Sequence, residues 1–90
     1  MRAQGIDERT LGILRDAGGV RGLRITAQGA RWYVEIQHGQ GGQWSPVVAQ
    51  RGHTRTWARI DTVIDWMRGQ GFAEASIDAR AYDPRQKALT

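Results

Sequence analysis

Two short stretches in the first half of the chain alternate between apolar and polar side chains, and this alternation constrains the fold more than any other feature. Residues 23–27 read Leu-Arg-Ile-Thr-Ala, and residues 32–37 place a tryptophan, a valine and an isoleucine on one face. A period of two is typical of a strand that buries one face only. Residues 28–31, Gln-Gly-Ala-Arg, suit a tight turn between them. The sequence therefore predicts an antiparallel hairpin.

The other expected elements follow from caps and from helical spacing of apolar residues. Asp7 suits a helix N-cap, and Gly18 and Gly19 suit the end of that helix. Pro46 favours a sheet edge or a bulge for the strand that contains it. Two registers of that strand remain possible, one that buries Trp44, Pro46 and Val48 and one that buries Val47 and Ala49. We expect a helix over residues 7–17, a strand over about 44–50, a longer helix over 57–68 and a last strand over 73–80.

These elements predict an α+β fold in the order α-β-β-β-α-β, with a mostly antiparallel sheet and the long helix packed on one face. Small residues on the inner face of the last strand would let that helix approach the sheet closely. The chain has 90 residues, which fits a single domain over 1–90. We expect an ordered core over about 6–81 and a polar tail over 82–90, because Pro84 discourages continuation of the strand.

Charge is distributed unevenly along the chain. The formal net charge is +4, and no acidic residue lies between Glu35 and Asp61. Cations just before a helix oppose its dipole, so a sequence that places them there is suited to an anionic partner. Cysteine is absent, and no export signal or membrane-length apolar run is present. These features favour a cytoplasmic protein that does not enter a membrane.

A nucleic-acid site is the first hypothesis for this basic segment. Arg51, His53, Arg55 and Arg59 could hold phosphates, with Arg24 on the hairpin as an additional contact. Replacing both Arg55 and Arg59 by glutamate would then weaken binding without unfolding the domain. The alternative is a solvated segment whose charges are neutralised by acidic residues, for which the candidates are Asp61, Asp65 and Asp83.

A protein-binding surface, used as an adaptor or for self-association, is the rival hypothesis. Tyr33, Trp44 and Trp57 are its candidate contacts, because aromatic residues and arginine are enriched at interfaces. Exposure beside an arginine would favour this role for Trp44 or Trp57, whereas burial of all four tryptophans would make them core residues. The face predicted to point away from the long helix carries Arg24, Thr26, Tyr33, Glu35 and Gln37.

No catalytic, cofactor or small-molecule signature accompanies these surfaces. Residues 39–42 are rich in glycine but lack the lysine and hydroxyl residue of a phosphate-binding loop. The spacing of His38 and His53 matches no compact metal motif, and Ser45 has no recognisable base in the sequence. We therefore expect a protein that is not an enzyme and that holds no metal or cofactor.

Two segments resemble the small plasmid-partition accessory proteins of the ParC type, which are unrelated to the topoisomerase subunit of that name. The first runs from Ile13 to Arg21 (ILRDAGGVR) and resembles an LLRDAG-x-VR opening. The second runs from Arg55 to Tyr82 and resembles a basic-aromatic entry, an LD-x-V helix, a glycine-aromatic exit and a VD strand. The resemblance implies an accessory role in plasmid or mobile-element maintenance. It brings no catalytic residues.

Overall fold

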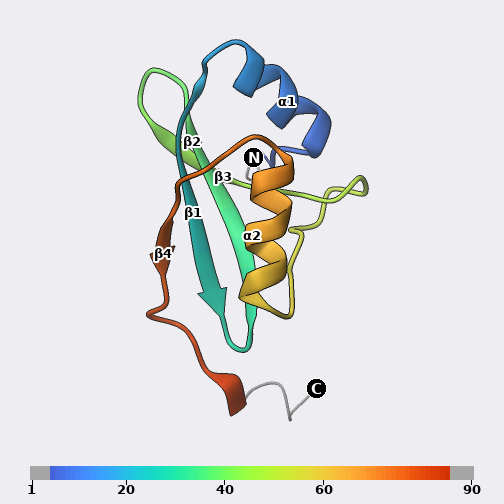
Figure 1. Cartoon of the computed structure of the whole chain (residues 1–90), viewed down its shortest axis with the longest axis vertical. Coiled ribbons are helices and arrows are strands. Elements are labelled where there is room, and N and C mark those ends of the chain that lie inside the picture. The colour runs from blue at the N-terminus through green and yellow to red at the C-terminus, as the bar shows by residue number, and fades with distance from the viewer. Residues whose placement is uncertain (1–4, 86–90) are drawn as a thin grey trace.

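The protein, described here by a computed structural model of residues 5–85, has two helices and a four-stranded mixed sheet in the expected order (Figure 1). Of the predicted tail 82–90, residues 86–90 lie outside the described residues, as do residues 1–4 of the predicted single domain. The elements are α1 (Glu8–Asp16), β1 (Val20–Gln28), β2 (Arg31–His38), β3 (Gln43–Pro46), α2 (Ile60–Gly69) and β4 (Ser76–Asp78).

The sheet has the order β3-β2-β1-β4, and only the β1–β4 pair is parallel. The predicted hairpin is confirmed: Gln28 pairs with Arg31, and Gly29 in the turn has a φ of 64°, as the first turn residue of a type II′ hairpin requires. Helix α2 packs on β2, and α1 lies near one end of the sheet (Figure 1). The apolar face of the hairpin is thus covered, and its polar face is left open.

The ends of α1 form as the sequence predicts. The Asp7 carboxylate accepts a hydrogen bond from the Thr10 backbone N–H at 2.8 Å. At the other end, Gly18 takes a φ of 72°, and the Gly19 N–H donates to the Leu14 carbonyl. This is the glycine-dependent helix end in which orphan carbonyls find partners. Leu11 brings the helix into the core, where its side chain is fully buried.

The prediction that the second helix begins at about Trp57 is wrong, and this helix is not markedly long. Helix α2 begins at Ile60 and has 10 residues, against 9 in α1. Trp57 is extended instead, and its backbone exchanges two hydrogen bonds with Trp32. The helical spacing of Trp57 reflects burial against the same core rather than helical backbone. The pairing with Trp32 satisfies the backbone N–H and carbonyl groups of Trp57, so these groups do not need a further helical turn to find partners.

The last two strands resolve one ambiguity and overturn one expectation. In β3 the buried face carries Ser45 and continues to Val47, which leaves Trp44 on the open face. Strand β4 is only three residues long, and its supposed inner face is not covered: Ile77 is 56% exposed. The expectation that small residues there bring the helix close is wrong, because α2 packs over β2 instead.

The first residues of the predicted tail are held against the hairpin. The Asp83 N–H donates to the Gly29 carbonyl at 2.8 Å, and the Gly29 N–H donates to the Ala81 carbonyl at 3.1 Å. The Tyr82 ring stacks on Trp32 with centroids 5.3 Å apart. Tyr82 therefore covers one face of the Trp32 ring, and Trp32 is only 8% exposed.

Candidate binding surfaces

Arg51 and His53 lie at the tip of a small hairpin that projects from the body of the protein. Val48 and Thr54 form its base, and the Ala49 N–H donates to the His53 carbonyl. Gly52 has a φ of 92°, the left-handed conformation that closes a three-residue hairpin loop. Both candidate side chains are exposed. Within residues 5–85, neither makes an ion pair.

Arg55, in contrast, is held in a cluster with Glu8, Trp57 and Trp66, which we call the Glu8 cluster. Its guanidinium is 2.7 Å from the Glu8 carboxylate and stacks 4.7 Å from the centroid of Trp57. Trp66 donates its indole N–H to the same carboxylate at 2.8 Å. The indole hydrogen bond, followed by the ion pair with Arg55, lowers the pKa of Glu8 below its usual value. Three elements thus meet at one carboxylate.

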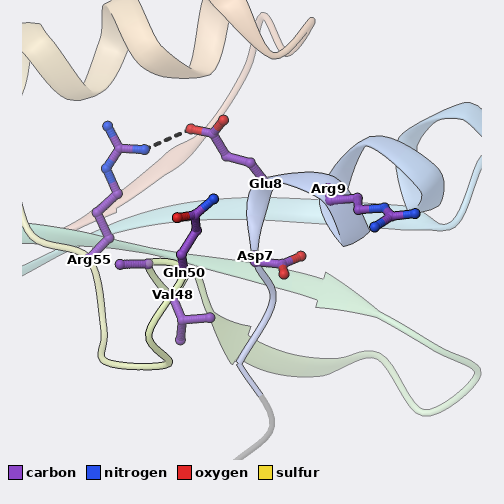
Figure 2. Close-up of a pocket in the computed structure, with 7 residues that line it drawn as sticks. Asp7, Glu8, Arg9, Val48, Gln50 and Arg55 are labelled. Carbon is purple, nitrogen blue, oxygen red and sulfur yellow. Dashed lines mark hydrogen bonds and ion pairs between the residues drawn. The ribbon is translucent and has the colours of Figure 1, made fainter.

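Glu8 is the residue of this cluster that sequence reasoning missed. It lies 47 positions before Arg55, and an acidic residue in the first turn of a helix is already explained by the helix dipole. The cluster borders an open hollow of about 710 Å³ between the start of α1 and the projecting hairpin. In Figure 2, Glu8 and Arg55 point toward each other across this hollow, whereas Arg9 points away.

Arg59 also has a carboxylate partner. Its guanidinium makes two parallel hydrogen bonds to Asp61, at 3.0 and 2.9 Å. This contact lowers the pKa of Asp61 and raises the pKa of Arg59. Asp61 lies in the first turn of α2, so it offsets the unfavourable placement of Arg59 at the N-cap. Arg59 therefore fits the alternative hypothesis, in which acidic residues neutralise the charges of the basic segment. Asp61 is one of the acidic residues expected in that role.

The open sheet face, which we define by Arg24, Thr26, Tyr33, Glu35, Gln37 and Trp44, brings three of the candidate residues together. Arg24 stacks 4.1 Å from the Trp44 ring centroid and donates to Glu35 at 2.9 Å. Thr26 donates to the same carboxylate oxygen at 2.9 Å. The Trp44 ring lies over Gly22, where an added Cβ would come within 3.3 Å of it. The arginine and the indole are therefore fixed in place before any partner binds.

Tyr33 lies on the same face and its environment is partly closed. Partial burial, reinforced by the negative charge of Glu35, raises the pKa of the Tyr33 hydroxyl. The side chain is half-buried, like those of Arg24 and Trp44. Trp57 does not belong with them, because it is 8% exposed and faces the core. Of the three candidate aromatic contacts, Tyr33 and Trp44 are accessible together.

A serine and a histidine that the sequence did not connect are also neighbours. His38 Nε2 lies 2.8 Å from Ser45 Oγ, a distance suited to a nucleophile and its base. However, Ser45 is only 5% exposed and points to the helix-covered side of the sheet. Neither residue borders the 710 Å³ hollow, nor either of the two hollows beside β1. We interpret the pair as a satisfied polar contact at the margin of the core.

Within residues 5–85, no group of histidine and carboxylate side chains is placed to hold a metal ion, and no helix is long and apolar enough to cross a bilayer. Comparisons of the chain with protein-family models, with curated proteins and with solved structures found no match.

Proposed function

We propose that this protein is a non-enzymatic binding module that holds a protein partner on the open sheet face, as an accessory in plasmid or mobile-element maintenance. The observation that carries the proposal is the gathering of Arg24, Tyr33 and Trp44 on a surface that no described element covers. The maintenance role rests on the resemblance to ParC-type proteins alone.

The chemistry of the face favours a protein over a polyanion. Arg24 is balanced by Glu35, so the centre of the face has no excess positive charge. The Arg24 Nε–H donates to Glu35, and the guanidinium carries further N–H donors that a backbone carbonyl or a carboxylate could use. Because stacking already fixes Arg24 and Trp44, binding would lose little side-chain entropy.

Trp44→Ala tests this proposal in a quantitative pull-down from host lysate with purified tagged protein. A central tryptophan contributes about 2 kcal/mol or more at an interface, so specific partners should be depleted on the order of 30-fold or more. Ile64→Ala is the matched control, since Ile64 is an exposed apolar residue on α2, which packs on the opposite side of the sheet. Partners retained equally by Trp44→Ala and by the wild type would argue against the open sheet face.

Nucleic acid is a second candidate partner, favoured by the projecting hairpin with exposed Arg51 and His53. Fluorescence anisotropy with labelled duplex DNA, single-stranded DNA and duplex RNA at several salt concentrations tests it. Log affinity should fall linearly with log salt, and Arg51→Glu should weaken binding to all three probes. This variant is cleaner than Arg55→Glu, which would place a second carboxylate beside Glu8. Absence of binding at low salt would leave the protein-partner proposal as the better supported one.

A further inference from the structure

A hollow of about 270 Å³ adjoins the open sheet face at the edge of β1. Strand β4 begins only at Ser76, so within residues 5–85 the first residues of β1, 20–23, have no strand beside them on that side. Gly22 lies in this gap and carries no side chain, and the Trp44 ring reaches it from β3. The hollow is therefore bounded by Gly22 and Trp44 on one side, and residues 74–76 form its outer wall.

Carboxylates gather on this side of the sheet. Asp78 lies on it because Asp78 pairs with Thr26, and residues paired across two strands share a face. Partial burial, followed by the negative charges of Glu35 and Asp78, raises the pKa of the Tyr33 hydroxyl. The charge of Asp78 is thus felt on the open sheet face, although Asp78 belongs to the strand at its border.

The outer wall of the hollow adds an acidic residue without a partner. Glu74 is exposed and makes no ion pair with a described residue. The other two carboxylates are paired, Glu35 with Arg24 at 2.9 Å and Asp78 with Arg80 at 2.7 Å. Three carboxylates therefore meet two guanidiniums here, and the balance is negative in a chain whose formal net charge is +4.

From this arrangement we propose that the hollow receives a lysine or arginine side chain of the protein partner, and that Glu74 selects partners with a basic residue at that position. The inference rests on the proposed function, because it specifies what the open sheet face binds. A volume of about 270 Å³ lies below the range of about 300–1,000 Å³ typical of small-molecule pockets, so it suits one side chain. The methylene stem would pack beside Trp44 and Ala75, and the charged end would pair with Glu74.

Other side chains suit the hollow less well. An acidic side chain or a phosphate would meet Glu74, and no described cation lines the hollow to attract it. An apolar side chain would shield Glu74 from water without pairing it, and a desolvated carboxylate without a partner is unfavourable. A basic side chain both fills the hollow and supplies the missing partner of Glu74.

Selection from a random peptide library displayed on phage tests the inference with purified protein. Peptides enriched on the wild type should share a lysine or arginine at one position of a common motif. Glu74→Lys should instead enrich aspartate or glutamate at that position, because like charges disfavour the original peptides. Asp65→Lys is the matched control, since it makes the same charge change at an exposed position of α2, on the opposite side of the sheet. It should keep the basic preference.

A double-mutant cycle then measures the contact itself. The tightest wild-type peptide, and a version with glutamine in place of its basic residue, are titrated into the wild type and into Glu74→Gln by calorimetry. Either single change should weaken binding about two- to fivefold, as expected for a partly exposed ion pair. The two changes together should weaken it no more than the larger single change. Effects that multiply as if independent would overturn the contact with Glu74.

The outcomes distinguish this inference from the proposed function. Peptides that no longer bind Trp44→Ala, but keep their basic preference on Glu74→Lys, would retain the open sheet face as the binding surface and overturn the role of Glu74. Peptides that bind both variants as well as the wild type would overturn both proposals. A selection that enriches no peptide on the wild type would also overturn both.

Discussion

The protein contains two arginine–tryptophan–glutamate groups that use the same chemistry in opposite ways. In the Glu8 cluster, Arg55 stacks on Trp57 and pairs with Glu8. On the open sheet face, Arg24 stacks on Trp44 and pairs with Glu35. The first group joins α1, the projecting hairpin and α2, whereas the second lies within three neighbouring strands. The first holds elements together, and the second displays its groups on a surface.

Sequence separation and burial account for this difference. Glu8 contacts Trp66 across 58 positions, while Arg24 contacts Glu35 across 11 positions within an already paired hairpin. Trp57 is buried, and Trp44 is half-buried. An arginine stacked on tryptophan is therefore not by itself a sign of a binding site. The useful distinction is whether its partners come from separate elements or from one surface.

Replacing the two tryptophans should give the largest contrast. Trp57→Ala removes a buried ring and should lower the free energy of unfolding by about 3–5 kcal/mol, as large-to-small core changes do. Trp44→Ala removes mainly a stacking contact with Arg24 and should lower it by about 1 kcal/mol. Urea denaturation followed by circular dichroism measures both. Similar losses of unfolding free energy in the two variants would show that the Glu8 cluster and the open sheet face do not differ in their contribution to stability.

Glu8→Ala should have the next largest effect, lowering the free energy of unfolding by about 1 kcal/mol through loss of the partners of Arg55 and Trp66. Glu8→Gln should lose less, because an amide oxygen still accepts the indole hydrogen bond. Glu74→Ala is the control, since Glu74 makes no ion pair with a described residue. If the control loses as much stability as Glu8→Ala, the cluster is not what stabilises the fold.

The charge of Glu8 should also be visible in the pH dependence of stability. Its pKa is lowered in the folded state from an ordinary value of 4.5. A lowered carboxyl pKa stabilises the fold above the unfolded-state value, and this contribution disappears as the pH falls through the folded-state value. The stability gap between wild type and Glu8→Gln should therefore narrow below about pH 4.5. A gap that is constant from pH 7 to pH 3 would show that the ionised carboxylate contributes nothing.

Gly22→Ala should have the smallest effect on stability while changing the open sheet face. The added Cβ would lie 3.3 Å from the Trp44 ring and 3.0 Å from the Gln37 side chain, so both must move slightly. The gain from replacing a strand glycine offsets this crowding, and the net change should stay within about 0.5 kcal/mol. We expect the Trp44 indole resonance to shift in an NMR spectrum. An unchanged resonance would indicate that the ring does not rest on Gly22.

The fold was predictable where local chemistry determines it. Alternation predicted β1 and β2, and Asp7 and Gly18 predicted the ends of α1. The failures occurred where a tertiary contact overrides a local pattern. Trp57 has helical spacing but pairs with Trp32, and the alternating residues around Ile77 form only a three-residue strand that α2 leaves uncovered.

The sequence predicted which residues lie on the candidate surfaces, but it did not predict all of the ion pairs that they form. Strand alternation alone places Arg24 and Tyr33 on one face, and the facing of β3 decides that Trp44 joins them. In the basic segment, Arg59 has the neighbouring partner that the sequence offers, Asp61. The partner of Arg55 comes from α1, and no sequence periodicity relates the two positions. Long-range ion pairs of this kind depend on how helices pack, which the sequence does not specify locally.

The contact between Glu8 and Trp66 also has a consequence for the order in which parts of the protein fold. The β1–β2 hairpin closes a two-residue turn, whereas the Glu8–Trp66 contact must close a loop across 58 positions. Longer loops lose more entropy on closing, so the hairpin should form early and this contact late. Contacts made after the transition state slow unfolding and leave the folding rate unchanged. We therefore expect Glu8 to affect how long the folded chain persists more than how quickly it forms.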